Sequence, residues 1–219
     1  MPVVDPTLDF ERSLFDGGTL SVIGCDEVGR GALAGPVAVG MTVINAHVGA
    51  FPAGLRDSKL VAEPKREALA PLCIEWALYS AVGLASAREI DELGIIACLG
   101  LAGKRALQLL HVQGAAVSDA IVLLDGNHDY LNPALSRTLN VVTRVKADQD
   151  CASVAAASVI AKVHRDRLMI DHSVRLPGYG WEGNKGYGSA GHLSAIAELG
   201  ATELHRRSWL KSPAVVQPA

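Results

Sequence analysis

Two adjacent carboxylates stand at the end of an apolar run. The sequence L-S-V-I-G-C-D-E-V-G-R-G places Asp26 and Glu27 directly after a segment that reads as a buried strand. Acids at the mouth of a buried strand repel each other and lose hydration, and a bound cation offsets both costs. The turn that follows, Gly29-Arg30-Gly31, adds an arginine, the side chain best suited to phosphate, between two glycines that let the backbone approach another molecule closely. These residue types together indicate metal-assisted chemistry on a phosphodiester.

Two further acids follow later apolar segments. Asp125 ends the run in I-V-L-L-D-G-N, and Asp148 stands in V-K-A-D just after another apolar segment. Each is ordinary by itself, since an Asp-Gly pair after an apolar run is a common turn and an acid commonly opens a helix. In a sheet whose strands alternate with helices, however, strand ends and the loops after them gather at one edge. We therefore expect Asp26, Glu27, Asp125 and Asp148 to converge on one point.

Glu27 poses a geometric condition for this convergence. Adjacent residues of a regular strand face opposite sides of the sheet. Glu27 can therefore share a site with Asp26 only if the strand has already broken into the turn, and the glycines at 29 and 31 are expected to break it there.

The length and composition place the chain among single-domain globular proteins. It has 219 residues, of which 49% are hydrophobic, and this is enough for one substantial core. We find no apolar run of transmembrane length and no signal-peptide layout at the acidic N-terminus, so a cytoplasmic protein without membrane association is expected. The four cysteines lack C-x-x-C spacing, and no Cys or His pair has zinc-ligand spacing, so we expect buried, reduced thiols and no zinc site.

The charge is unevenly distributed along the chain. Residues 1–137 carry 10 Lys and Arg against 16 Asp and Glu, whereas residues 138–219 carry 10 against 7. A basic C-terminal part could face phosphates while clustered acids hold a metal. The asymmetry is modest and by itself decides nothing.

The apolar pattern predicts an α/β fold with one catalytic domain over residues 19–211, between a lead-in at 1–18 and a short tail at 212–219. A short link joins the first two strands, which favours an antiparallel pair, and the third is expected to be antiparallel too. A capping box at Ser86–Glu89 marks the start of a short helix. The predicted strands cover residues 20–26, 37–44, 76–84, 120–124 and 139–145; the other predicted helices cover 65–75, 95–111, 151–169 and 192–199, with a glycine-rich loop over 178–191.

An ordered set of motifs runs through the whole chain. D-E-V-G-R-G is followed by D-S-K at 57–59, L-D-G-N at 124–127, K-A-D and A-A-A-S-V-I-A-K-V-H-R-D-R within 146–167, and P-G-Y-G and N-K-G-Y-G within 177–188. This series resembles bacterial ribonuclease HII over about residues 19–209, and chance recurrence of so many motifs in order is very rare.

The resemblance implies an RNase H-like fold: a mixed five-stranded sheet, its first three strands antiparallel, flanked by helices, with a helical C-terminal part. It implies an endonuclease that cuts RNA–DNA hybrids and also duplex DNA on the 5′ side of embedded ribonucleotides, leaving 3′-hydroxyl and 5′-phosphate ends. The implied cofactor is Mg²⁺ or Mn²⁺, two ions with substrate bound. The family's four metal-binding catalytic acids match Asp26, Glu27, Asp125 and Asp148; Asp148 is preferred to Asp150 because it follows K-A without a gap.

The resemblance also implies substrate contacts. In the family, the turn that matches Gly29, Arg30 and Gly31 contacts the 2′-hydroxyl and the neighbouring phosphates, which separates RNA from DNA. The tyrosine that matches Tyr187 stacks on the sugar of the next deoxynucleotide. Lys59 and Lys185 are further candidate phosphate contacts, and affinity from such contacts should fall steeply with salt.

The chain departs from the family pattern in a few places. Asn184 stands where the family usually has His, and Leu60 replaces a second lysine after D-S-K. These changes bear on substrate contacts more than on the chemistry. Lys162 and Arg165 suit a structural or a functional role equally, and His205-Arg206-Arg207 reads as a solvated basic patch or a late DNA contact.

Three other functions compete with this one. A ribonuclease HIII would carry an N-terminal substrate-binding domain, and fewer than 20 residues precede the first strand. A catalytically silent hybrid-binding module would lack one of the acids. A sugar- or nucleotide-phosphate enzyme would need a longer glycine loop opening a helix, whereas G-R-G-A-L-A-G-P leads into a strand. We expect a monomer, and the tail S-P-A-V-V-Q-P-A contains no clear peptide for binding a replication clamp.

Overall fold

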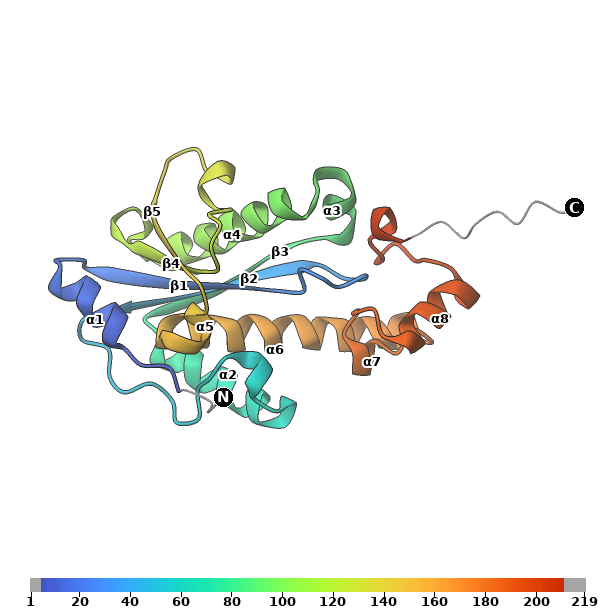
Figure 1. The fold of residues 1–219 in the computed structure, drawn as a ribbon, viewed down its shortest axis with the longest axis horizontal. Helices are drawn as coiled ribbons and strands as arrows, with labels where there is room; N and C mark the ends of the chain where they lie inside the picture. The colour runs from blue at the N-terminus through green and yellow to red at the C-terminus, as the bar shows by residue number, and fades with distance from the viewer. Residues whose placement is uncertain (1–4, 211–219) are drawn as a thin grey trace, which may run out of the picture.

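A computed structural model describes residues 5–210. Residues 1–4 of the predicted lead-in, the last residue of the predicted domain (211) and the predicted tail at 212–219 lie outside the described residues. Its centre is a five-stranded mixed sheet in the order β3-β2-β1-β4-β5 (Figure 1). The strand pairs β1–β2 and β2–β3 are antiparallel, and β1–β4 and β4–β5 are parallel. The predicted sheet is therefore confirmed. The strands are β1 (Ser21–Val28), β2 (Val37–Asn45), β3 (Tyr79–Ala85), β4 (Ile121–Asp125) and β5 (Asn140–Arg144).

One face of the sheet is covered by α4 (Ile95–Val112), which packs on β2 and β3. Alternate strand residues such as Ile23, Cys25 and Met41 point toward this helix, as the two-residue period of a strand requires. By length and composition alone α4 could cross a membrane, contrary to the expectation that no such run exists. Its buried face on the sheet gives the physical reason for its apolar character, since a core helix needs the same residues.

The other face is covered by the long helix α6 (Ala152–Arg175), with α2 (Glu63–Trp76) packed outside it (Figure 1). The first half of α6 consists mostly of small residues, and it meets glycines in the strands. A Cβ at Gly24 would lie 2.3 Å from the backbone of Ser153, and one at Gly40 would lie 2.5 Å from the carbonyl oxygen of Ala157. This close approach brings the polar residues of α6 within reach of the strand ends.

The segment predicted as a lead-in contains a helix, α1 (Asp9–Asp16), that packs on the same face as α6. Its fully buried Glu11 accepts hydrogen bonds from the backbone N–H and the hydroxyl of Ser153, at 2.9 and 2.7 Å. The backbone of Thr7 also bonds to residues 150 and 152. These contacts hold the start of α6, which follows the short segment that carries Asp148, against the sheet.

The remaining helices follow the predicted pattern, with differences at some of their ends: α6, for example, runs to Arg175, six residues beyond the predicted end at 169. The capping box of Ser86 and Glu89 is present and opens α3 (Ala87–Leu93). Helix α2 runs on through Trp76, so β3 begins three residues later than predicted. The predicted loop at 178–191 contains a one-turn helix, α7 (Trp181–Asn184), because its tryptophan is fully buried in a separate small core.

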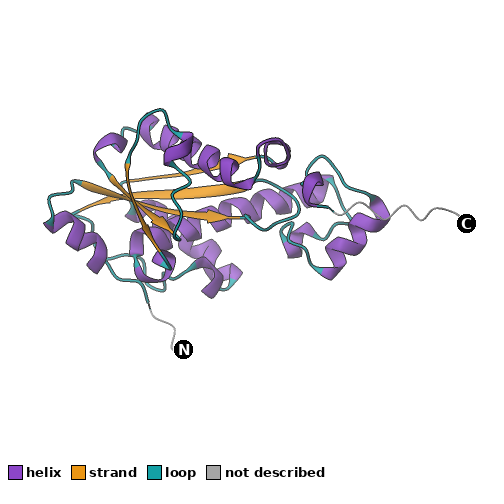
Figure 2. Cartoon of the chain, turned by 45° about the horizontal axis from the view of Figure 1, so that its top comes forward, coloured by secondary structure: helices purple, strands orange, loops and turns teal. Residues whose placement is uncertain are grey.

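The C-terminal part lies beyond one end of the sheet, at the end of α6 (Figure 2). It comprises α7, α8 (Ala190–Leu199) and a short 3-10 helix (Arg207–Trp209). The other short helices are α5 (Ala147–Asp150) and the 3-10 helices Ser58–Leu60, Val117–Asp119 and Asn132–Ala134.

Candidate active site

The first and third acids stand side by side at the ends of two neighbouring parallel strands. The pairing of β1 with β4 runs to Cys25 opposite Leu124, so Asp26 and Asp125 occupy the next equivalent positions. Equivalent residues on adjacent parallel strands lie about 4.8 Å apart and on the same face of the sheet. Asp26 is buried, whereas Asp125 is half-buried. The strand-end geometry expected from the sequence thus brings these two together.

Glu27 reaches the site without a break in its strand. The expectation that β1 ends before Glu27 is wrong, because Glu27 pairs with Val39 and β1 continues to Val28. Glu27 therefore leaves from the opposite side of the strand to Asp26. Because Glu27 lies close to the end of β1, its carboxylate still interacts electrostatically with Asp125. It also forms a 3.4 Å ion pair with Arg30.

Asp148 is placed by the turn between β5 and α6. Lys146 adopts a left-handed conformation (φ 62°) that starts the short helix α5. The backbone N–H of Asp148 points at Asp125 Oδ1, at a donor–acceptor distance of 3.4 Å. Its buried carboxylate is 3.7 Å from Lys59 Nζ. Asp26, Glu27, Asp125 and Asp148, called the strand-end acids below, thus come from three segments far apart in the sequence.

Asp26, Glu27 and Asp148 are held in surroundings that oppose their ionisation. Burial raises the pKa of Asp26 well above its usual range, and the charges of the other three acids raise it further, although a hydrogen bond from Ser158 lowers it. Burial also raises the pKa of Glu27, partly offset by Arg30. Burial, then Asp125, raise the pKa of Asp148 to about 7. The cluster therefore carries more negative charge than its surroundings stabilise.

Two residues of the D-S-K region belong to the site beyond those chosen from the sequence. Asp57 is buried, accepts a 3.0 Å hydrogen bond from the N–H of Lys59, and raises the pKa of Asp148. The hydroxyl of Ser58 lies 2.8 Å from that of Ser158, which contacts Asp26. The D-S-K motif marked this segment, but an acid in a loop does not by itself show what it will lie against. The place of Asp57 beside Asp148 depends on how the loop packs on α6.

The donor set fits hard divalent cations. All four strand-end acids offer carboxylate oxygens, the ligands that Mg²⁺ and Mn²⁺ prefer, and a cation would relieve their mutual repulsion. Within residues 5–210, however, no three His, Cys, Asp or Glu side chains form a ready cage around one ion. The acids therefore fit ions that take only one or two protein carboxylates each and complete their shell with water and substrate oxygens, as Mg²⁺ commonly does.

The turn Gly29–Gly31, called the recognition turn below, lies directly beyond β1. Gly29 has φ 79°, and a Cβ there would lie 2.0 Å from Arg165 Nε, so the fold itself requires glycine. Gly31 has no such need, because a Cβ would meet nothing within 4 Å. Arg30 and Gly31 are both exposed. The second glycine thus leaves open space and bare backbone on the surface beside the strand-end acids.

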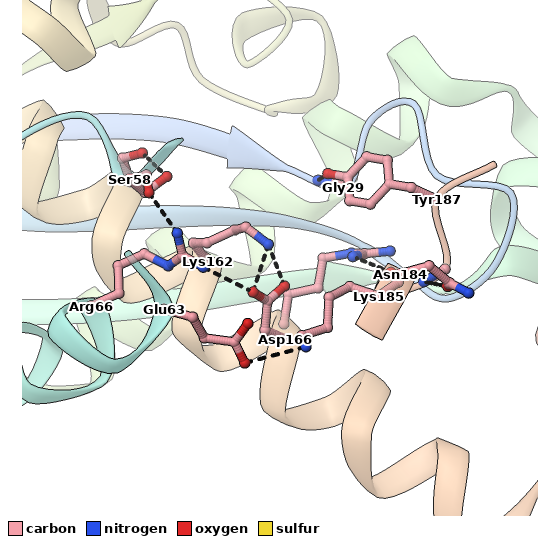
Figure 3. A network of polar contacts seen from close by, with 12 residues as sticks. Gly29, Ser58, Glu63, Arg66, Lys162, Asp166, Asn184, Lys185 and Tyr187 are labelled. Atoms are coloured by element: carbon pink, nitrogen blue, oxygen red, sulfur yellow. Dashed lines mark hydrogen bonds and ion pairs between the residues drawn. The ribbon is translucent and has the colours of Figure 1, made fainter. Parts of the chain in front are cut away.

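Tyr187 and Lys185 differ in their exposure and in their partners. The Tyr187 hydroxyl accepts a 3.1 Å hydrogen bond from the N–H of Gly29, and its ring is 36% exposed beside the recognition turn (Figure 3). Lys185 is buried, and its ammonium is engaged by the carbonyl of Glu182 and, at 3.2 Å, by Glu63. In this conformation the ammonium group of Lys185 is engaged within the protein rather than directed at a substrate.

Helix α6 organises the loops around the site (Figure 3). Lys162 forms 2.5 and 2.6 Å contacts with both oxygens of Asp166, which lies 3.6 Å from Arg66. Arg66 in turn donates to the carbonyl oxygens of Ser58 and Val61, both at 2.7 Å. Lys162 thereby acts through Asp166 and Arg66 on the D-S-K segment.

The interpretation of His205-Arg206-Arg207 as a solvated patch or DNA contact is wrong for its first two residues. His205 and Arg206 are buried, and only Arg207 is exposed. His205 Nε2 lies 3.2 Å from Nε2 of His192, and the sequence alone carried no signal for this pairing across 13 residues. The reason is the small C-terminal core around Trp181 and Tyr179, which covers both imidazoles.

A family model and curated proteins that resemble this chain point to the same family. The family model described as Ribonuclease HII matches residues 23–212. A curated ribonuclease HII from Streptomyces avermitilis is 44% identical over 219 aligned residues, covering 99% of this chain and 89% of the relative.

Solved structures agree in fold. The ribonuclease H2 from Pyrococcus horikoshii OT3 superposes with a TM-score of 0.68 at 26% identity, covering 87% of this chain and 94% of that one. A ribonuclease HIII in complex with Mn²⁺ superposes with a TM-score of 0.67 at 25% identity, covering 87% of this chain and 67% of that one. The expected RNase H-like fold is confirmed.

Proposed function

Because the chain belongs to the ribonuclease HII family, we propose that it is an endonuclease that cleaves the RNA strand of RNA–DNA hybrids and nicks duplex DNA on the 5′ side of embedded ribonucleotides. The products would be 3′-hydroxyl and 5′-phosphate ends. The observation that carries this proposal is the meeting of four carboxylates, three of them in surroundings that oppose their ionisation, with an exposed glycine-arginine-glycine turn at one end of the sheet.

The strand-end acids would hold two divalent ions, Mg²⁺ or Mn²⁺. Asp26 and Asp125 would be central to holding them, since they stand at equivalent ends of adjacent strands. When bound, the ions would supply an activated water and stabilise the leaving 3′-oxygen. The Mn²⁺ of the related ribonuclease HIII supports a divalent cofactor.

Asp148 would serve the second ion or carry a proton at product release. In the metal-free cluster, burial and Asp125 raise the pKa of this carboxyl to about 7, and a bound cation would lower it, so departure of an ion would favour uptake of a proton. Lys59, exposed for most of its length and 3.7 Å from Asp148, is free to turn toward a substrate phosphate. The recognition turn would contact the 2′-hydroxyl, because its open backbone at Gly31 lets a ribose approach closely.

A nicking assay tests the proposal. The substrate is a duplex with one ribonucleotide, incubated with Mg²⁺, with Mn²⁺ or with chelator. We expect a single nick on the 5′ side of the ribonucleotide with either metal and none with chelator. An all-DNA duplex is the control. Cleavage of that control at a similar rate, or cleavage undiminished by chelator, would contradict the proposal.

Tyr187 provides a test of junction sensing. Tyr187→Ala removes the ring beside the recognition turn and its hydrogen bond to Gly29. Stacking by an aromatic side chain contributes about 1–3 kcal/mol per contact, so cleavage at a lone ribonucleotide should fall roughly tenfold or more. A long hybrid offers many ribonucleotides and should suffer less. An equal loss on both substrates would remove the junction-sensing role.

A further inference from the structure

Two arginines are buried completely behind the recognition turn. Arg165 lies on α6, and Arg206 lies just before the last 3-10 helix; each is 0% exposed. Within the described part of the chain, every hydrogen bond from their guanidinium groups goes to a backbone carbonyl oxygen rather than to a carboxylate. A buried cation without an acid partner is costly, and carbonyl dipoles in good geometry are what offsets that cost here.

Both guanidinium groups donate hydrogen bonds to the same loop. Arg165 and Arg206, called the turn clamp below, both donate to the segment that runs from the recognition turn to β2, and Arg165 donates also to Lys185. The acceptors of Arg165 are the carbonyls of Pro36 (2.8 Å), Ala34 (3.0 Å) and Lys185 (2.9 Å). Those of Arg206 are Gly29 (2.6 Å), Arg30 (2.8 Å) and Gly35 (3.2 and 3.3 Å).

The turn clamp also reaches Tyr187. The guanidinium carbon of Arg165 lies 5.4 Å from the centre of the Tyr187 ring, within the range of a cation–π contact. Tyr187 in turn accepts from the N–H of Gly29, whose missing Cβ makes room for Arg165. The turn, the tyrosine and the arginine therefore fix one another's positions.

The two charges act on each other and on the turn. Burial lowers the pKa of Arg165, and burial together with the charge of Arg165 lowers the pKa of Arg206 to about 10. Both groups remain cationic at neutral pH. Two positive charges thus lie immediately behind an exposed turn, without a carboxylate within hydrogen-bond reach in the described chain.

We propose that Arg165 and Arg206 are positioning residues for ribonucleotide recognition, holding the recognition turn and Tyr187 in the shape that selects a ribose. Their buried charges also make the turn attractive to the phosphates beside that ribose. The proposal rests on the proposed function for its substrate, but the holding of the turn is a property of the free protein. It gives a function to two side chains that the motifs left undecided.

The test replaces each arginine by lysine in the full chain. Arg165→Lys and Arg206→Lys keep the positive charge but cannot donate to several carbonyls as a planar fork. Arg167→Lys is the matched control, since Arg167 lies on the same helix, is 61% exposed and pairs with Glu67. Each variant is assayed on a duplex with one ribonucleotide and on a long hybrid, and its backbone amide exchange is measured.

The expected result is selective. For the single ribonucleotide, kcat/KM should fall by about 10- to 100-fold, the loss typical of a displacement of roughly 1 Å in a positioning element. The long hybrid should lose less, and kcat on it should stay close to that of the control. Amide exchange should accelerate over residues 29–36 but not over 121–125, where Asp125 lies.

Two outcomes would overturn the proposal: equal loss on both substrates, or faster exchange of the turn with unchanged selectivity. If neither lysine variant folds, the same two measurements are made on Tyr187→Phe, which removes only the hydroxyl that accepts from the N–H of Gly29. Faster exchange at Gly29 with reduced selectivity supports the proposal, and faster exchange with full selectivity contradicts it. A wild-type protein that does not cut at a ribonucleotide refutes the proposed function instead, while the exchange data still report whether the arginines hold the turn.

Discussion

The strand-end acids are buried or half-buried and the turn clamp is fully buried, yet the two groups of charges are stabilised in opposite ways. The two clamp arginines donate to six different carbonyl groups and need nothing further. Among residues 5–210, the ion pairs of these acids are with Lys59 and Arg30 alone, at 3.7 and 3.4 Å. One region is complete in the free protein, and under the proposed function the other would be completed by the ions it binds.

This difference suits the turn clamp to holding its neighbours in place and the strand-end acids to binding cations. A group whose polar atoms are all satisfied holds its neighbours in one arrangement, because moving it would leave a buried charge unpaired. A cluster of like charges destabilises the free protein and favours any cation that enters. The protein therefore contains a turn held in place by satisfied buried charges, beside a cluster of acids that a bound cation would stabilise.

The largest expected effect comes from removing an acid. Asp125→Asn should reduce metal-dependent nicking by about 10³-fold or more, since a metal supplies several kcal/mol of transition-state stabilisation and each tenfold is 1.36 kcal/mol. The metal-free variant should unfold at an equal or higher temperature, because one repelling charge is gone. Asp119→Asn, an exposed acid before the start of β4, is the control. An active Asp125→Asn enzyme would refute the metal role.

The second effect concerns pH in the C-terminal part that carries Arg206. Burial first, then the charges of His192 and Arg207, lower the pKa of His205 from 6.5 to about 4. Between these values the unfolded chain binds a proton that the folded chain does not. Stability from this group is therefore complete above pH 6.5 and lost as the pH falls toward 4, by up to about 3 kcal/mol.

Chemical denaturation of the wild type and of His205→Gln between pH 4 and 8 checks this expectation. The difference between the two proteins isolates the histidine, since the acids with raised pKa values act in the opposite direction in both. A difference in unfolding free energy that does not change with pH would show that His205 is readily protonated in the folded protein.

A slightly smaller effect separates the two regions directly. Mg²⁺ or Mn²⁺ should stabilise the wild type by about 2.7 kcal/mol at a concentration 100 times the dissociation constant. Thermal unfolding with and without metal measures this. Asp26→Asn should lose most of the metal-induced stabilisation, whereas Arg206→Lys should keep it even though its own stability is lower. Loss of the metal effect in Arg206→Lys would mean that the two regions are not independent.

The smallest effect distinguishes the two glycines of the recognition turn. Gly29→Ala should destabilise the fold by about 1–3 kcal/mol because of its positive φ, with further loss from the clash with Arg165. Gly31→Ala should leave the unfolding temperature unchanged and raise KM for the ribonucleotide substrate. Thermal unfolding and nicking kinetics on the pair provide the comparison. Equal stability losses would mean that Gly31 also has a structural role.

Much of the fold could be predicted because it depends on local pattern. The apolar runs marked all five strands, the capping box at Ser86 marked a helix start, and the acids at strand ends marked the site. α1 was not predicted, because its short helix is stabilised mainly by packing and by the burial of Glu11 against α6. The one-turn helix α7 likewise depends on a tertiary contact, the burial of Trp181.

The sequence by itself determined which residue types could do chemistry, since two adjacent acids, a glycine-arginine-glycine turn and later acids after apolar runs are visible without coordinates. Only the tertiary structure decided the environment of each charge. It placed Asp57 beside Asp148, turned Lys185 inward, and buried Arg165 and Arg206 behind the recognition turn. The physical reason is that burial and charge pairing depend on segments distant in sequence, whereas the period of a strand or helix depends on near neighbours alone.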